Sequence, residues 1–186
     1  PSVSEVVPIL PDLGDNIQFG NSLVSQTELN GISGANRQMM EIAPFDWSTI
    51  NNGCGFDVII GNPPYVNTEG MHALLPSAEV EIYKKKYKTS HKQFDKYFIF
   101  IEQAINKINE NGLVCYIVPN KFFKIGAGEK LRNLIAKERM LVSLDDFGDA
   151  QLFEDKTIYS SIILLSKAKQ TSFVYSSVDS ANKLWA

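Results

Sequence analysis

The spacing of apolar positions changes several times after residue 55. Phe56–Ile60 is a continuous, mostly β-branched run closed by Gly61 and two prolines, which is typical of a buried parallel strand. Over residues 94–108 the apolar positions recur every three or four residues, which predicts a helix of about four turns. Leu113–Val118 is again continuous and apolar. Strand, helix and strand in this order predict a right-handed parallel βαβ unit.

The same alternation extends toward the C-terminus. A second helix is predicted over 129–138, followed by a strand over Leu141–Phe147. Residues 157–165 and 173–178 are rich in β-branched and aromatic side chains, and we expect them to pair antiparallel at a sheet edge. Among the first 50 residues, a short apolar piece, Ile17–Phe19, precedes a loop-like stretch rich in Ser, Asn and Gly. The pattern therefore predicts an α/β fold.

Composition limits the partners and the location. The chain has 186 residues, 44% of them hydrophobic, so it can bury a core, and a net charge of −3 means that nucleic acid must be contacted through a local basic patch. Residues 84–92 hold five lysines that can form such a patch or a solvated helix face. Two cysteines are too few for a disulfide framework or a zinc site, so we expect no metal. No apolar run approaches the ~20 residues of a membrane span, so we expect a cytoplasmic protein without a membrane partner.

The candidate chemistry lies in Asn62-Pro63-Pro64-Tyr65, directly after the first predicted strand. Each proline fixes its own φ at about −65° and lacks an N–H, and Pro63 pushes Asn62 into extended geometry. A rigid turn that caps a strand is the plain interpretation of such a sequence. The functional interpretation is a stiff corner whose carbonyl oxygens are free to accept hydrogen bonds from a ligand.

Two acceptors at this corner can activate an exocyclic purine amine. Such an amine is a weak nucleophile because its lone pair is delocalised into the ring. The Asn62 side-chain oxygen and the Pro63 carbonyl can hold its two hydrogens and favour a tetrahedral nitrogen whose lone pair points at a methyl sulfonium. Tyr65 can stack on a base that has been flipped out of a duplex. The tetrapeptide thus predicts amino-group methylation.

The tetrapeptide resembles motif IV of amino-group methyltransferases, and the order of further segments is similar to gamma-type DNA adenine-N6 methyltransferases of restriction-modification systems, especially fused type II enzymes. The likeness spans nearly the whole chain. It implies a Rossmann-like fold, S-adenosylmethionine as cofactor, and double-stranded DNA as substrate. It also implies that Asn62, Pro63, Pro64 and Tyr65 are catalytic, with Tyr65 contacting the base and Pro64 contacting the cofactor.

The resemblance implies three further site residues. Asn21 in Asn16–Leu23 matches the motif III residue that contacts the adenine ring of the cofactor, and a polar turn is its alternative interpretation. Phe100, in a segment similar to motif V, is placed near the cofactor, although packing is an equally good explanation. Phe153 matches the motif VIII aromatic that would stack on the adenine opposite Tyr65, and it can instead anchor a loop to the core.

Two parts of the family pattern are missing, namely the glycine-rich motif I and the acidic residue of motif II. We therefore expect a partial sheet, from the third strand onward, with an antiparallel C-terminal edge, and a chain that is inactive alone. Residues 1–50 are expected to be a loosely packed or displaced linker and motif III segment. Residues 51–170 are the catalytic half, and 171–186 begin the connection to an absent target-recognition domain. The expected partners are the rest of the parent polypeptide or another copy, bound at an exposed sheet edge.

Other functions stay open at this point. Enzymes that methylate a glutamine side chain or a guanine of ribosomal RNA also carry Asn-Pro-Pro-Tyr. A non-catalytic DNA-binding or interaction module is the alternative from another class, because motif I is missing.

Overall fold

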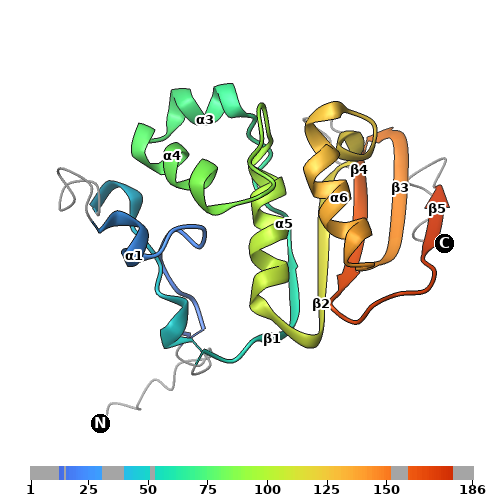
Figure 1. Ribbon diagram of the computed structural model, residues 1–186, viewed down its shortest axis with the longest axis horizontal. Coiled ribbons are helices and arrows are strands. Elements are labelled where there is room, and N and C mark those ends of the chain that lie inside the picture. The colour runs from blue at the N-terminus through green and yellow to red at the C-terminus, as the bar shows by residue number, and fades with distance from the viewer. Residues whose placement is uncertain (1–12, 15, 31–39, 51–52, 152–158, 178–186) are drawn as a thin grey trace, which may run out of the picture.

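Five strands form one mixed sheet in the order β1-β2-β4-β3-β5. The structure, a computed structural model, describes residues 13–177 except 15, 31–39, 51–52 and 152–158 (Figure 1). β1 pairs parallel with β2, β4 runs antiparallel to both β2 and β3, and β5 pairs parallel with β3. The strands are β1 (Phe56–Gly61), β2 (Ile108–Pro119), β3 (Leu141–Gln151), β4 (Tyr159–Ser166) and β5 (Val174–Ser177).

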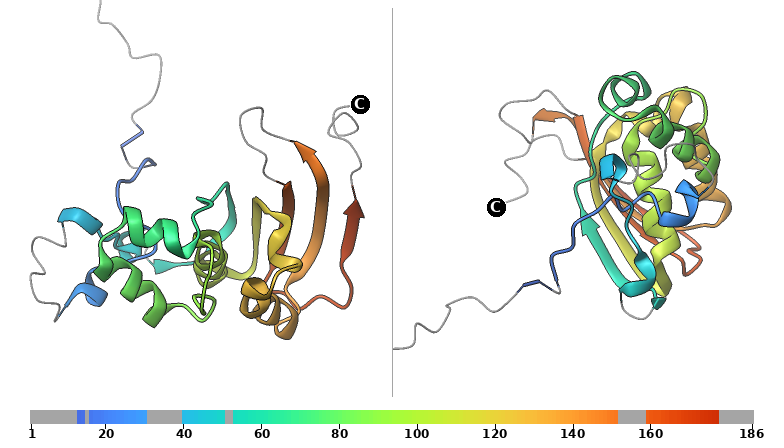
Figure 2. Two further views of the ribbon diagram at one scale, coloured as in Figure 1. Left: turned by 90° about the horizontal axis from the view of Figure 1, so that it is seen from above. Right: turned by 90° about the vertical axis from the view of Figure 1, so that its left-hand side faces the viewer.

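The helices precede, connect and cover these strands. They are α1 (Gln26–Leu29), η1 (Trp47–Thr49), α3 (Thr68–Leu74), α4 (Ser77–Lys86), α5 (Lys96–Lys107), η3 (Asn120–Phe123), η4 (Gly126–Gly128) and α6 (Glu129–Lys137). α5 and α6 lie on one face of the sheet, as Figure 1 and the right-hand view of Figure 2 show. The expected α/β class and the parallel unit of β1, α5 and β2 are confirmed.

The boundary between α5 and β2 differs from the expected one. The apolar spacing predicts a helix through residue 108, but α5 ends at Lys107 and Ile108 is already extended, with φ −78° and ψ 152°. Ile108 pairs with Phe56 as the first residue of β2. Gly112 belongs to the strand as well, because a Cβ there would lie 2.7 Å from the Phe56 carbonyl oxygen. The close approach of two strands therefore requires this glycine.

The C-terminal strands also differ in detail from the expected arrangement. β4 is antiparallel, as expected, but it lies between β2 and β3 rather than at the edge. The edge is formed by β5, which runs parallel to β3. Since β4 reads Ser-Ser-Ile-Ile-Leu-Leu with alternating full and partial burial, its composition suits a strand with a neighbour on each side.

The described part of the segment before β1 contributes buried side chains to the core but contains no strand. Leu23, Val24, Leu29 and Ile42 are buried in the core. Ile17 and Phe19 are 71% and 91% exposed, so this segment does not form the third strand of the expected partial sheet. A three-residue apolar piece has little to pack against here, because its sheet neighbours in the family order are the strands that this sequence lacks. Whether residues 1–50 act as a displaced unit stays a prediction.

One edge and one face of the sheet are left open around β1. Among the described residues β1 pairs only with β2, and its side chains Val58 and Ile60 are 54% and 75% exposed. They point away from the face covered by α5, on which Ile59 packs against the core. No helix among the described residues is both long and apolar enough to cross a membrane.

Candidate active site at the carboxyl end of β1

The Asn62–Tyr65 corner lies where β1 ends, beside the carboxyl end of β2. Gly61 pairs with Tyr116, so the corner stands alongside the last residues of β2. Asn62 and Pro64 are exposed, Pro63 is buried, and Tyr65 is half-buried. β1 has no fully buried residue, so the expectation of a buried strand is wrong: its outer edge and one face have no neighbour among the described residues. The buried Pro63 nevertheless holds an exposed amide at the edge of the sheet.

The hydroxyl of Tyr65 is placed between two acceptors. It donates to Asn62 Oδ1, and it also lies 2.9 Å from the carbonyl oxygen of Ile117 in β2. Burial raises the pKa of Tyr65 to about 12, so the hydroxyl keeps its proton at neutral pH. One proton serves one acceptor at a time, so the hydroxyl can turn to Ile117 when another donor reaches Asn62.

The carbonyl of the buried Pro63 has no hydrogen-bond donor among the described residues. With Asn62 Oδ1 released by Tyr65, the corner offers two neighbouring oxygen acceptors and no backbone N–H from either proline.

The Tyr65 ring packs against a buried aromatic cluster. Its ring meets Tyr97 of α5 edge-to-face at 6.1 Å between centroids, and Tyr97 meets Phe122 in the same way at 6.5 Å. The Tyr97 hydroxyl donates to the Pro119 carbonyl at 3.4 Å. Tyr97 and Phe98 are both fully buried, so they are core residues. Tyr65 is therefore held on one side and open on the other.

Asn21 is fixed by residues that the sequence did not single out. Its Nδ2 donates to Glu79 Oε1 at 3.0 Å and to Tyr83 Oη at 3.3 Å, both in α4. Its Oδ1 accepts from the backbone N–H of Leu23 at 3.1 Å. The side chain therefore lies against α4, and its oxygen keeps one lone pair for a further donor.

Of the two further aromatic site candidates, Phe100 and Phe153, the structure describes only the first. Phe100 is half-buried and packs against the core from α5, which is compatible with a contact to a cofactor at its exposed side. Phe153 lies outside the described residues. The pairing of Tyr65 with Phe153 around a base thus stays a prediction.

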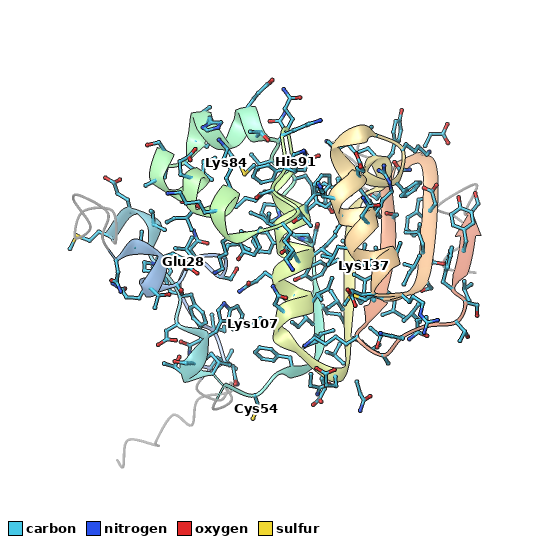
Figure 3. The ribbon with its side chains drawn as sticks, in the orientation of Figure 1. Glu28, Cys54, Lys84, His91, Lys107 and Lys137 are labelled. Atoms are coloured by element: carbon cyan, nitrogen blue, oxygen red, sulfur yellow. The ribbon has the colours of Figure 1, made fainter. Side chains whose placement is uncertain are left out.

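The lysines after residue 83 divide into two groups. Lys86 is committed to the fold, because it donates to the Leu23 carbonyl at 3.0 Å and pairs with Glu28 at 3.0 Å. Lys84 pairs with the exposed Glu81 at 3.1 Å. The side chains of Lys85, Lys88 and Lys92 are exposed, and no ion pair to the described residues holds them. Lys84 and His91 mark this surface at the end of the molecule that carries α3 (Figure 3).

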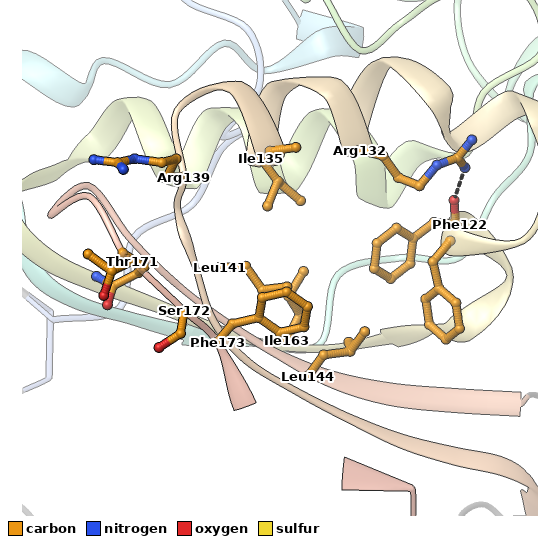
Figure 4. Close-up of a pocket in the computed structure, with 13 residues that line it drawn as sticks. Phe122, Arg132, Ile135, Arg139, Leu141, Leu144, Ile163, Thr171, Ser172 and Phe173 are labelled. Atoms are coloured by element: carbon orange, nitrogen blue, oxygen red, sulfur yellow. Dashed lines mark hydrogen bonds between the residues drawn. The ribbon is translucent and has the colours of Figure 1, made fainter. Parts of the chain in front are cut away.

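A cavity of about 390 Å³ lies apart from this corner. It runs between α6 and the sheet, with Ile135, Leu141, Leu144, Ile163 and Phe173 as apolar lining and Arg132 and Arg139 among its polar groups (Figure 4). Neither Asn62 nor Tyr65 lines it. The candidate chemistry is therefore at an open strand end rather than in this cavity.

Known proteins are similar to this chain in sequence and in fold. Residues 13–153 match the family described as Eco57I restriction-modification methylase, which is more than half of the chain. The chain belongs to the Eco57I restriction-modification methylase family. The expectation of a restriction-modification methyltransferase is thereby confirmed at the level of the family.

Relatives of the Eco57I-family chain are much longer than the chain itself. It is 41% identical over 182 residues to the Escherichia coli type II restriction enzyme and methyltransferase RM.Eco57I, covering 98% of this chain and 17% of that protein. It is 31% identical over 113 residues to the Pseudomonas aeruginosa type II methyltransferase M.PaeR7I, covering 60% of this chain and 19% of the relative. The chain thus spans about a fifth of these relatives.

Solved structures share the fold at low sequence identity. A Listeria monocytogenes protein described as a class I S-adenosylmethionine-dependent methyltransferase has a TM-score of 0.51 and 19% identity over 67% of this chain and 37% of its own. The type IIL restriction-modification enzyme MmeI, determined in complex with DNA, has a TM-score of 0.56 and 15% identity over 73% of this chain and 19% of its own. The sheet of this Eco57I-family chain is therefore that of a methyltransferase.

Buried polar contacts near the corner were not predicted from the sequence of this Eco57I-family chain. Lys121, directly after β2, pairs with the buried carboxylate of Asp95 at 3.0 Å. Asn120 donates to Asp146 of β3 at 2.8 Å, and both are buried. These partners are 26 residues apart in sequence, so only the folded sheet brings them together.

Proposed function

We propose that the chain supplies the base-handling part of a DNA adenine-N6 methyltransferase. The observation that carries the proposal is the corner at the end of β1, where Asn62 Oδ1 and the Pro63 carbonyl are available to one amine. Family membership supports the methyltransferase class, and the two oxygens support an amino group as its target. A ring carbon has no such pair of hydrogens to offer.

The residues of the corner act by position rather than by covalent chemistry. An adenine turned out of the duplex lies on the open side of Tyr65, whose ring is steadied by Tyr97. Its amine donates one hydrogen to Asn62 Oδ1 and the other to the Pro63 carbonyl, while the Tyr65 hydroxyl turns to the Ile117 carbonyl. The nitrogen becomes tetrahedral, and its lone pair is free to attack.

S-adenosylmethionine, when bound, supplies the electrophilic methyl group. Residues of this chain fit part of its site: Asn21 keeps an acceptor lone pair for an adenine ring, while Pro64 and Phe100 present exposed surface near the corner. The sequence lacks the glycine-rich loop and the ribose-binding acid that the family resemblance calls for. We infer that these come from a separate segment, so that the isolated chain is inactive.

The open side of β1 is the place where that segment would join. Val58 and Ile60 are apolar and exposed, and the other edge of β1 is unpaired among the described residues. A parallel strand on this edge, with its helix on the uncovered face, would bury both side chains. We favour the rest of the methyltransferase polypeptide over a second copy, because the relatives that match are single, longer chains.

Double-stranded DNA is the proposed substrate. Lys85, Lys88 and Lys92 are exposed and free of ion pairs to the described residues, in the segment that follows the corner. A net charge of −3 leaves these lysines as a local source of phosphate contacts. Methylation of a protein glutamine or of ribosomal guanine is less favoured, because the matched relatives are restriction-modification enzymes.

A hybrid enzyme tests the proposal directly. The 182-residue matched segment of the E. coli relative is replaced by this chain, and the purified hybrid is incubated with duplex DNA and labelled S-adenosylmethionine. We expect N6-methyladenine in the digested DNA by mass spectrometry. The unmodified E. coli enzyme is the control for assay conditions. A folded hybrid that binds cofactor and forms methylcytosine, or no methylated base, would contradict the proposal.

Two variants of Tyr65 in this hybrid separate the ring from the hydroxyl. Tyr65→Ala removes the stacking surface and should lower methyl transfer by roughly ten- to a hundredfold, since a stacked base is worth about 1–3 kcal/mol. Tyr65→Phe keeps the ring and frees Asn62 Oδ1, so activity should stay within about threefold. Initial rates at saturating cofactor measure both. Equal losses in the two variants would show that the hydroxyl, not the ring, carries the role.

A further inference from the structure

A buried polar cluster links Asn21 to helices α4 and α5. Glu79 is 3% exposed and Tyr83 is fully buried. Glu79 Oε1 accepts from Asn21 Nδ2 at 3.0 Å and from the Tyr83 hydroxyl, and it pairs with Lys96 Nζ at 3.6 Å. Tyr83 Oη in turn accepts from Asn21 Nδ2 at 3.3 Å. Each proton in the cluster has a defined donor and acceptor.

This cluster allows the Asn21 amide a single orientation. Both Nδ2 hydrogens are taken by oxygens of α4, and Oδ1 takes the Leu23 N–H. A flipped amide would place Oδ1 against the Glu79 carboxylate and would leave Leu23 N–H without its acceptor. Because Lys96 neutralises Glu79 from the other side, the carboxylate stays an acceptor.

The fixed amide can accept from a ligand but cannot donate to it. Its only spare capacity is the second lone pair of Oδ1, since both hydrogens are used within the described cluster. A ligand group that meets Asn21 must therefore carry an N–H or an O–H. An exocyclic amine satisfies this condition, and a ring carbonyl at the same place would face another oxygen.

The cluster also lies next to the catalytic corner. Lys96 pairs with Glu79, and its neighbour Tyr97 meets the Tyr65 ring edge-to-face, so the first turn of α5 contacts both the cluster and the corner. A cofactor that reaches from Asn21 to Asn62 would pass this turn, one turn before Phe100. α4 therefore contacts Asn21 directly, and α5 connects it to Tyr65.

We propose that Glu79, with Tyr83, is a positioning residue that sets the cofactor specificity of Asn21 for a 6-aminopurine over a 6-oxopurine. The inference rests on the proposed function, because it takes S-adenosylmethionine as the ligand. Glu79 acts through Asn21 and does not touch the cofactor. With glutamine at position 79 the neighbour can donate as well as accept, so a flipped amide loses only the bond from the Leu23 N–H and no longer faces a carboxylate.

The test compares two product analogues in the hybrid enzyme defined above. Calorimetry gives dissociation constants for S-adenosylhomocysteine and for S-inosylhomocysteine, which carries a 6-carbonyl in place of the 6-amine. We expect the unaltered chain to prefer the amine by about tenfold or more. Glu79→Gln should reduce that preference to within about threefold, mainly by tighter binding of the inosyl compound. Tyr83→Phe, which keeps the carboxylate, should reduce it less.

Glu81→Gln is the matched control, because it removes the same charge from an exposed position of α4. Its preference should equal that of the unaltered chain. An unchanged ratio in Glu79→Gln, with only a lower melting temperature, would reduce Glu79 to a structural role and overturn the inference. Absence of any preference in the unaltered chain would overturn it as well. Failure of the proposed function appears elsewhere, as methylation of another base at normal cofactor affinity.

Discussion

Replacing Asn62 by alanine should lower methyl transfer by about two to three orders of magnitude while the fold stays intact. The side chain is exposed at the end of β1, so its loss creates no cavity in the core. What disappears is one of the two acceptors that hold the amine, and the Pro63 carbonyl alone leaves the nitrogen planar. Single-turnover rates of the hybrid enzyme with duplex DNA measure the effect on the chemical step.

The Asn62 variant needs two companion measurements. The melting temperature and the affinity for S-adenosylhomocysteine should both match those of the parent hybrid. Asn67→Ala is a suitable matched variant, since this exposed asparagine caps α3 through a bond to the Gly70 N–H and is not placed in the site. It should lose stability and keep its rate. Turnover near the parent rate in Asn62→Ala would remove Asn62 from the mechanism.

Truncating Phe98 to alanine should destabilise the chain by about 3–5 kcal/mol. Phe98 is fully buried in α5, and its ring meets Tyr97 edge-to-face at 4.6 Å between centroids. The loss is a large part of the 5–15 kcal/mol that typically stabilises a domain, so the soluble yield should fall with it. Urea unfolding of the 186-residue chain gives the free-energy difference.

Phe100 provides the comparison on the same helix. It is half-buried two residues further along α5, so Phe100→Ala should cost markedly less stability than Phe98→Ala. In the hybrid enzyme the same change should weaken cofactor binding, which Phe98→Leu should not. Equal destabilisation by both alanine variants, without any effect of Phe100→Ala on affinity, would identify Phe100 as a packing residue.

Local sequence predicted the stiff corner after β1 and the main strands because their causes are local. Two prolines stiffen Asn62–Tyr65 wherever they occur, and a β-branched run such as Val58–Ile60 favours a strand, although this strand is more exposed than the pattern indicates. The end of α5 could not be predicted in this way. Asn111-Gly112 suits a helix stop, but Gly112 is needed for contact between β1 and β2, which is a property of the assembled sheet.

The supporting contacts of the site were out of reach for the same reason. Glu79 lies in a segment crowded with lysines, where a carboxylate normally belongs to a solvated helix face, yet it is buried against Asn21. Lys121 and Asp95 come from different elements and meet only because α5 begins beside the end of β2. Local sequence identifies candidate reacting groups, but the residues that orient them are brought together only by the folded chain.

β1 has few of the features with which natural proteins protect the rim of a sheet. It contains no lysine and no proline, and Asp57 is its one charged residue. Rim strands usually carry such residues as gatekeepers, because bare N–H and C=O groups beside apolar side chains invite another chain to add itself. At high concentration we therefore expect the isolated chain to aggregate through β1, the strand that leads into the proposed catalytic corner.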